Sequence, residues 1–149
     1  YFLFMSDRTI GYTTGVFDMF HIGHLRVLQR ARENCDHLIV GVTSDQLCIE
    51  RKQKAPIIPE WERMEIVKAL KCVDEVVRET NLDKLVAWEE LKFDRIFKGD
   101  DWKGSQLWNN YEKEFLLRNV EVVYFSYTVH TSSTLLRQKI DNEVQHRKE

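Results

Sequence analysis

Two histidines, His21 and His24, stand three residues apart in the stretch GVFDMFHIGH, with a glycine between them. The stretch follows a short β-prone run and opens a helical pattern, so both histidines fall in the first turn of a predicted helix. The backbone N–H groups of such a turn favour an anion, and imidazoles there can donate hydrogen bonds to phosphate oxygens. Taken alone, the pair is also compatible with a simple helix cap or an isolated pair of metal ligands.

Three further polar clusters stand near the ends of later predicted strands. They are the basic run RKQK at 51–54, the acidic pair Asp100–Asp101 and the hydroxyl run TSST at 131–134. Each has an ordinary interpretation, namely a solvated loop, a turn and a helix N-cap. Together they offer cations and hydroxyls for phosphate groups and a carboxylate for a hydrated Mg²⁺, which suits phosphoryl or nucleotidyl transfer.

Hydrophobic patterning predicts alternating strands and helices that would bring these clusters together. Strands are expected at 9–14, 37–44, 73–77, 93–99 and 119–125, and helices at 22–34, 59–71, 82–90, 106–118 and 131–144, with 45–59 as a loop. Strict alternation predicts the α/β class, as one Rossmann-like domain whose five-stranded parallel sheet carries helices on both faces. In such sheets ligands bind outside the carboxyl ends of the strands, where all four clusters are expected.

The composition indicates how many domains the chain forms and which partners and locations to expect. The 149 residues are 43% hydrophobic and 31% charged, so one domain is expected over 5–149, with Met5 as the native start and Tyr1–Phe4 as additions to it. The net charge of −2 gives no reason to expect a nucleic-acid partner. No apolar run approaches the ~20 residues that span a bilayer, so no membrane insertion is expected. The three cysteines form no C-x-x-C pair, which predicts a reducing, cytoplasmic location.

Six motifs occur in a fixed order along about residues 9–140. They are GVFDMFHIGHLRVLQRARENCDHLIVGVTSD from Gly15, then KQK, the pair Glu62–Arg63, VDEVV at 73–77, GDDW at 99–102 and VVY at 122–124. In this order they resemble the glycerol-3-phosphate cytidylyltransferases, a branch of the nucleotidyltransferase superfamily that carries the H-x-G-H motif. H-x-G-H alone is moderately specific, whereas its combination with GDDW in this order is strong.

The resemblance implies a role for each cluster. In the family, the two histidines contact the triphosphate of CTP and stabilise charge on its α-phosphate, while an acceptor phosphate attacks in line and pyrophosphate leaves. By resemblance, the catalytic residues are His21, His24, Lys52, Lys54 and Arg63. The implied nucleotide-binding residues are Gly15, Val16, Phe17, Asp18, Gly23, Gly99, Asp101, Trp102, Thr128, Ser132, Ser133 and Thr134. The resemblance also implies Mg²⁺ with the triphosphate, without identifying its protein ligands, and a homodimer.

One block departs from the family pattern. The family usually carries R-T-x-G-I-S-T-T where this chain reads YTVHTSST at 127–134, so Tyr127 replaces an arginine that helps to bind the nucleotide. A tyrosine supplies a ring and a hydroxyl but no positive charge. Arg137 stands in the last predicted helix, and we expect it to compensate for the missing cation.

These observations predict an enzyme that transfers CMP from CTP to a phosphorylated alcohol such as glycerol 3-phosphate. The product would be a CDP-alcohol for surface-polymer synthesis. The altered block at 127–134 motivates an alternative with another nucleotide or acceptor, such as an adenylyltransferase acting on FMN or a sugar phosphate. A second alternative is a catalytically inactive nucleotide-binding domain. The chain is too short for a class I aminoacyl-tRNA synthetase and has no KMSKS-like loop.

Overall fold

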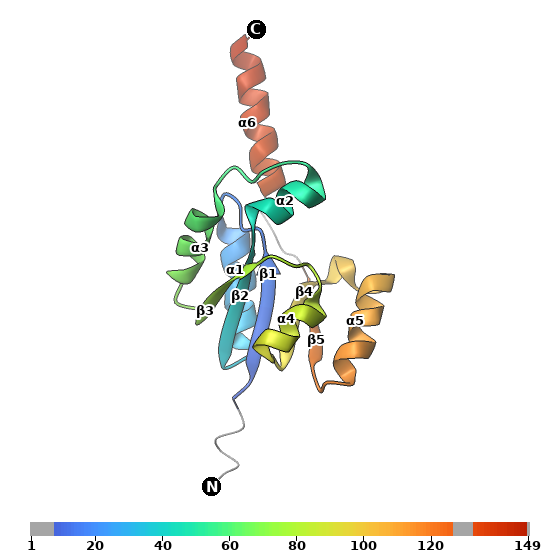
Figure 1. The fold of residues 1–149 in the computed structure, drawn as a ribbon. Helices are drawn as coiled ribbons and strands as arrows, with labels where there is room; N and C mark the ends of the chain where they lie inside the picture. The colour runs from blue at the N-terminus through green and yellow to red at the C-terminus, as the bar shows by residue number, and fades with distance from the viewer. Residues whose placement is uncertain (1–7, 127–132, 149) are drawn as a thin grey trace.

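Five parallel strands form one sheet in the computed structural model, which describes residues 8–126 and 133–148 (Figure 1). The strands are β1 (Ile10–Gly15), β2 (His37–Thr43), β3 (Glu75–Glu79), β4 (Arg95–Gly99) and β5 (Glu121–Phe125). Their spatial order is β3-β2-β1-β4-β5, and every pairing is parallel. The predicted α/β class and the five-stranded parallel sheet are therefore confirmed.

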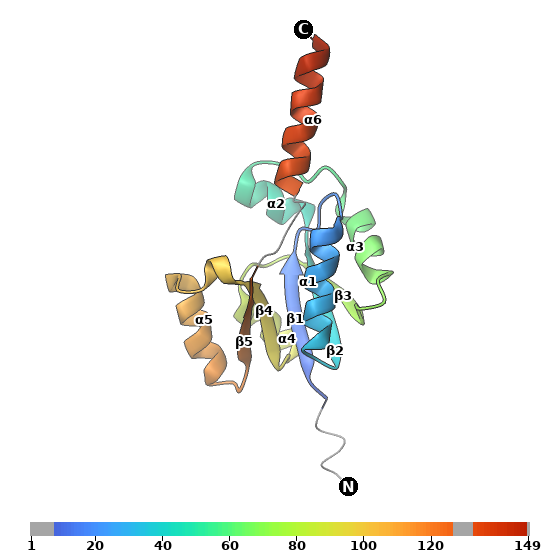
Figure 2. The ribbon, with the colours of Figure 1, turned by 180° about the vertical axis from the view of Figure 1, so that it is seen from behind.

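Helices cover both faces of this sheet, as the two opposite views show (Figure 1 and Figure 2). The helices are α1 (Ile22–Glu33), α2 (Asp45–Lys52), α3 (Glu60–Lys68), α4 (Lys84–Leu91), α5 (Gln106–Leu116) and α6 (Ser133–Lys148), with a 3₁₀ turn, η2, at Asp100–Trp102. Side chains of α1 and α3 pack into one core cluster, and side chains of α4 and α5 pack into the other. The continuous apolar run of β2 is buried because both clusters cover it.

The segment 45–59 was expected to be a loop, and this prediction is wrong for its first half. Asp45–Lys52 forms α2. The Ser44 hydroxyl caps the helix by accepting a hydrogen bond from the Leu47 N–H, at 3.1 Å. Leu47 and Cys48 are buried beneath it. Tertiary packing of these two side chains outweighs the polar, basic composition that suggested a loop.

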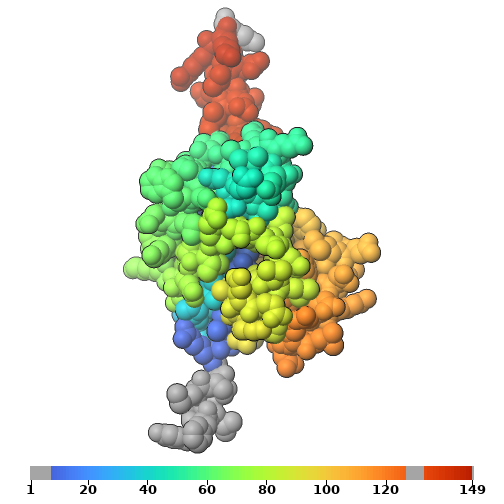
Figure 3. All heavy atoms as spheres, in the orientation of Figure 1, coloured from blue at the N-terminus to red at the C-terminus, as the bar shows by residue number. Residues whose placement is uncertain are grey.

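Several other boundaries differ from the expected ones by a few residues. Strand β3 begins at Glu75, and just before it Asp74 bonds to Leu38 twice, its side chain accepting the Leu38 N–H and its own N–H donating to the Leu38 carbonyl. The last helix runs to Lys148 and extends away from the rest of the molecule (Figure 3). The predicted additions at 1–4 lie outside the described residues. No helix in the described part of the chain is both long and apolar enough to cross a membrane.

The strand order places a topological switch point between β1 and β4. From β1 the chain moves outward to β2 and β3, and it then returns to the other side of β1 to form β4. Paired residues between β1 and β4 end at Tyr12 and Ile96, although the two strands continue to Gly15 and Gly99. The carboxyl ends of these strands therefore separate, and a ligand crevice is expected at this point.

Candidate active site

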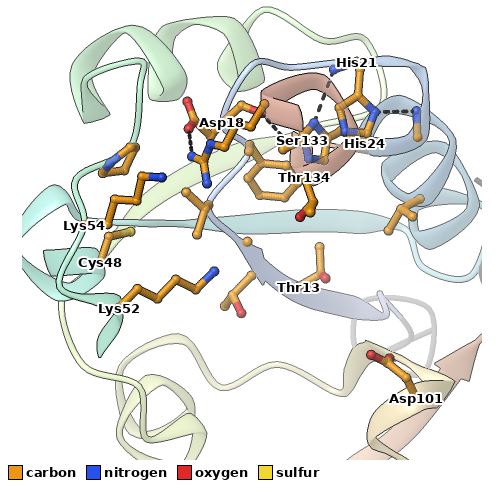
Figure 4. A pocket seen from close by; sticks show the side chains of 18 residues that line it. Thr13, Asp18, His21, His24, Cys48, Lys52, Lys54, Asp101, Ser133 and Thr134 are labelled. Atoms are coloured by element: carbon orange, nitrogen blue, oxygen red, sulfur yellow. Dashed lines mark hydrogen bonds and ion pairs between the residues drawn. The ribbon is translucent and has the colours of Figure 1, made fainter. Parts of the chain in front are cut away.

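A cavity of about 790 Å³ lies at the carboxyl ends of the strands (Figure 4). This volume is within the range of ~300–1,000 Å³ that is usual for small-molecule sites. Twelve of the residues predicted from the sequence line it, namely Gly15, Val16, Phe17, Asp18, His21, Gly23, His24, Lys52, Lys54, Asp101, Ser133 and Thr134. They come from segments far apart in the chain, so the fold brings together the clusters that the sequence singled out.

Three predicted residues do not line this cavity in the described part of the chain. Gly99 lines a smaller neighbouring cavity, and Trp102 lies on η2 with its ring near the Lys98 ammonium. Arg63 is fully buried in the protein. Thr128 and Ser132 lie outside the described residues, as does Tyr127, so the predictions made for these positions stay predictions.

The loop from β1 to α1 holds Asp18 in a strained backbone. Phe17 and Met19, on either side of it, have φ values of 54° and 49°, in the left-handed region that non-glycine residues rarely adopt. The Asp18 carboxylate accepts hydrogen bonds from the backbone N–H groups of Ile57 and Ile58, both at 2.9 Å. These bonds tie the loop to the segment before α3 and fix one wall of the cavity.

Asp18 also joins the last helix to the site. Its carboxylate forms an ion pair with the Arg137 guanidinium, and its carbonyl accepts a hydrogen bond from the Ser133 hydroxyl at 2.7 Å. Burial alone would raise the pKa of Asp18, but the Ile57 and Ile58 N–H groups and Arg137 outweigh burial and lower it. Asp18 is therefore an anion whose role is to hold α6 and Arg137 against the cavity.

His21 and His24 form the first turn of α1 and cap it reciprocally. The Nδ1 atom of His21 accepts the Gly23 N–H at 3.0 Å, and Nδ1 of His24 accepts the His21 N–H at 3.3 Å. The two rings stack with their centres 3.8 Å apart. Because each Nδ1 accepts a hydrogen bond, the proton of each neutral ring is on Nε2, where it can be donated to a ligand.

Both imidazoles are neutral at pH 7 in this environment. Burial lowers the pKa of His24 to about 4, with a further lowering by His21 that Asp18 partly opposes. Burial also lowers the pKa of His21. In the neutral form each ring keeps Nδ1 as the acceptor of the capping bond and Nε2 as a hydrogen-bond donor toward a ligand oxygen.

The low pKa of His24 predicts that stability falls in mild acid. An unfolded chain binds a proton at this histidine below about pH 6.5, whereas the folded chain resists protonation until about pH 4. The free energy of unfolding should therefore decrease as the pH falls from 6.5 to 4. The variant His24→Gln, which keeps the capping acceptor, should show a shallower decrease in urea titrations across this range. The exposed control His146→Gln should follow the parent chain, and equal slopes for all three proteins would contradict the assignment.

Lys52 and Lys54 approach the cavity from the end of α2 (Figure 4). The residue between them, Gln53, has a φ of 55° and ends the helix, with its N–H bonded to the Ile49 carbonyl at 2.8 Å. This left-handed turn redirects the chain, so both lysines reach the same cavity although they are two residues apart. Their ammonium groups can act there as mobile point charges for phosphate.

Arg63 lies beneath the site rather than in it. Its guanidinium donates to the carbonyls of Ile58, Val16 and Thr43 and to the Asp45 carboxylate, at distances of 2.6–2.9 Å. Its side chain has no exposed surface. Arg63 therefore connects the β1–α1 loop, the end of β2 and the loop before α3, which makes it a positioning residue for the cavity walls.

Sequence reasoning missed five lining residues, namely Thr13, Thr14, Val27, Cys48 and Pro56. The two threonines end β1, and the rule that ligands bind at carboxyl strand ends could have identified them. Cys48 was missed because α2 was not predicted. Arg137, expected to compensate for Tyr127, does line the cavity, and its buried Nε atom has no hydrogen-bond partner among residues 8–126 and 133–148.

The family of this chain follows from comparison with known proteins. A family model described as cytidylyltransferase-like matches residues 12–139. The chain therefore belongs to the cytidylyltransferase-like family, and with it to the nucleotidyltransferase enzymes. This confirms the class of protein expected from the sequence.

The chain is also similar to individual proteins of known name. The chain is 33% identical to the glycerol-3-phosphate cytidylyltransferase of Bacillus subtilis (strain 168) over 135 residues, covering 86% of this chain and 94% of the relative. It is 40% identical to the FAD synthase of Thermococcus sibiricus over 118 residues, covering 77% of this chain and 78% of the relative. A solved structure of a lipopolysaccharide core biosynthesis protein from Thermoplasma volcanium GSS1 matches with a TM-score of 0.71 and 29% identity, covering 82% of this chain and 99% of the other.

Proposed function

We propose that this enzyme transfers CMP from CTP to a phosphorylated alcohol such as glycerol 3-phosphate, releasing pyrophosphate. The CDP-alcohol formed would serve surface-polymer synthesis. The observation that carries the proposal is the convergence of His21, His24, Lys52 and Lys54 on one cavity of nucleotide size. Similarity to a glycerol-3-phosphate cytidylyltransferase over most of both chains supports the choice of substrates.

In the proposed reaction, an oxygen of the acceptor phosphate attacks the α-phosphorus of CTP. The bond from that phosphorus to the bridging oxygen breaks, pyrophosphate leaves with the electron pair, and a diphosphate link joins cytidine to the alcohol. The acceptor phosphate is already an anion, so no protein base is required. The Nε2 donors of His21 and His24 would stabilise charge on the phosphate oxygens, and Lys52 and Lys54 would hold the triphosphate.

Mg²⁺ fits the residues that are present. Asp101 lines the cavity, whereas the Asp18 carboxylate is engaged by Arg137 and two backbone N–H groups. No group of three or more histidines, cysteines or acidic residues in the described ranges could hold a metal ion by itself. Asp101 would therefore supply one ligand, with phosphate oxygens and water as the others. The bound ion would neutralise part of the triphosphate charge.

The proposal includes a cytoplasmic location and a homodimer. The three cysteines are unpaired and of raised pKa through burial, which suits a reducing compartment. On α6, Ile140 and Val144 are about half exposed one helical turn apart, and such side chains support contact with a second copy.

A second candidate function is transfer of an adenylyl group to FMN or a sugar phosphate. Similarity to a protein named FAD synthase and the replacement of an arginine by Tyr127 favour it. The test is pyrophosphate release with Mg²⁺, offering CTP, ATP, GTP and UTP with glycerol 3-phosphate, and then with FMN and sugar phosphates. Release with CTP and glycerol 3-phosphate alone is the expected result. Release only with ATP would select the second candidate, and none with any pair would favour a catalytically inactive nucleotide-binding domain.

Arg137 is expected to replace the missing arginine in nucleotide binding. Its Nη2 atom engages Asp18, and the guanidinium lines the cavity with further N–H groups that have no partner among the described residues, so donors remain for a phosphate. The variant Arg137→Met should raise the KM for the nucleotide by about 10-fold, because a charge-assisted hydrogen bond contributes about 1.5–3 kcal/mol. Steady-state kinetics should show no such change for Lys139→Met, an exposed control on the same helix. An unchanged KM in Arg137→Met would exclude this role.

A further inference from the structure

Lys98 is a half-buried cation that the mechanism above does not use. It is the penultimate residue of β4, and it forms no hydrogen bond or ion pair with any other described residue. Its Nζ atom lies 4.9 Å from the centre of the Trp102 ring and 5.6 Å from that of Trp108. Aromatic faces attract an ammonium group but do not neutralise its charge.

The surroundings of Lys98 favour the arrival of an anion. Burial lowers the pKa of Lys98 to about 8, with a further lowering by the charge of Lys84, while Asp101 and Glu79 act in the opposite direction. The group is therefore still mainly protonated at pH 7. A partly desolvated cation that forms no ion pair with a described carboxylate is stabilised when an anionic ligand binds beside it.

A small cavity lies where β1 and β4 separate. It has a volume of about 60 Å³, and Lys98 and Gly99 line it on the β4 side. Thr13, Thr14 and Val27 line both this cavity and the main one. The space beside Lys98 therefore adjoins the proposed nucleotide site at the switch point of the sheet.

Other lysines near the site are already engaged or lie elsewhere. The Lys84 ammonium bonds to the Glu79 carboxylate at 2.6 Å and to the Thr14 hydroxyl at 3.2 Å. Because Thr14 accepts that bond, its own proton can be donated to a ligand. Lys52 and Lys54 reach the main cavity from α2, which follows β2. Among the four lysines named here, Lys98 is the one on β4.

The strand order places Lys98 on the other side of β1 from Lys52 and Lys54. β1 lies between β2 and β4, so the α2 lysines line the main cavity from the β2 side, whereas Lys98 lines the adjoining small cavity on the β4 side. In-line displacement needs the attacking oxygen and the leaving pyrophosphate on opposite sides of the α-phosphorus. If Lys52 and Lys54 hold the pyrophosphate group, the acceptor must therefore bind on the β4 side.

We propose that Lys98, with the space between the ends of β1 and β4, is the subsite that binds the phosphate monoester of the acceptor. The inference rests on the proposed nucleotidyl transfer and adds to it the location of the second substrate. It applies to any acceptor that carries a phosphate monoester, because the recognised chemistry is the phosphate itself.

The test measures binding as well as turnover. Glycerol 3-phosphate and inorganic phosphate are titrated calorimetrically at pH 7 into the full chain preloaded with Mg²⁺ and the α,β-methylene analogue of CTP, which cannot be cleaved there. The proteins are the parent chain, Lys98→Met and the control Lys92→Met. Lys92, at the end of α4, makes a similar contact with a tryptophan: its Nζ atom lies 4.0 Å from the centre of the Trp88 ring. The affinity of each protein for the CTP analogue is measured separately.

Lys98→Met is expected to weaken glycerol 3-phosphate and inorganic phosphate binding about 10-fold or more, with unchanged affinity for the CTP analogue and no change in Lys92→Met. In turnover assays the KM for the acceptor should rise in the same proportion. An equal loss of affinity for the acceptor and for the CTP analogue in Lys98→Met would assign Lys98 to the nucleotide and overturn the proposal. Unchanged acceptor affinity in Lys98→Met would also overturn it, and so would a parent chain that binds neither phosphate ligand. Absence of turnover with intact, Lys98-dependent phosphate binding would instead count against the proposed function alone.

Discussion

Replacing His24 with glutamine is expected to lower kcat by ~10²–10³-fold while the protein stays folded. The imidazole Nε2 is the donor that faces the cavity, because Nδ1 already accepts the His21 N–H. Glutamine can keep that capping bond, as glutamine commonly does at the third position of a helix. The loss should therefore report the missing donor toward the phosphates rather than damage to α1.

The same reasoning applies to His21, with asparagine as the matched replacement. Asparagine is a good N-cap and can accept the Gly23 N–H, which His21 now accepts at 3.0 Å. Turnover of His21→Asn and His24→Gln should be compared with that of His146→Gln, whose side chain is exposed on α6. Circular dichroism confirms folding of each protein. Near-normal turnover in either active-site variant would remove the histidines from the mechanism.

Arg63→Met is expected to destabilise the protein by about 3–5 kcal/mol, the second large effect. The substitution keeps an apolar stem of similar length but leaves three buried carbonyl groups and the Asp45 carboxylate without their donor. Each unsatisfied group costs about 1–3 kcal/mol. Activity should fall together with stability, because the segments that Arg63 connects, the β1–α1 loop among them, form the walls of the cavity.

Urea unfolding followed by tryptophan fluorescence measures this effect. Arg63→Lys should lie between the parent chain and Arg63→Met, because lysine restores the charge but not the planar arrangement of donors. The control is Arg26→Met on α1, whose guanidinium is exposed and bonds only to Gln29 among the described residues. Its stability should change by at most about 0.5 kcal/mol. A loss of kcat in Arg63→Met with unchanged stability would instead show that Arg63 contacts the substrates.

The sequence predicted the class of fold because its patterns are local. The buried run of β2 and the periodic helix α1 each identify their own secondary structure, and alternation then requires a parallel sheet. The carboxyl-end rule needs no further knowledge of the strand order. The rule therefore suffices to group His21, Lys52 and Asp101 from the sequence alone.

The parts that the sequence did not predict depend on contacts between distant segments. Arg63 carries no local sign that its acceptors will be Val16 and Thr43, 47 and 20 residues away. The position of Lys98 beside Trp108 depends on how α5 packs against β4. The separation of β1 from β4 is a property of the register, which alternation alone does not specify.

The most direct test of the account follows the phosphorus atoms by ³¹P NMR. The parent chain is incubated with Mg²⁺, CTP and glycerol 3-phosphate, and the signals are recorded over time. Pyrophosphate and a diphosphate diester should form in equal amounts, as glycerol 3-phosphate and CTP disappear together. Formation of CMP or CDP without the diester, or unchanged signals at concentrations where both substrates bind, would contradict it.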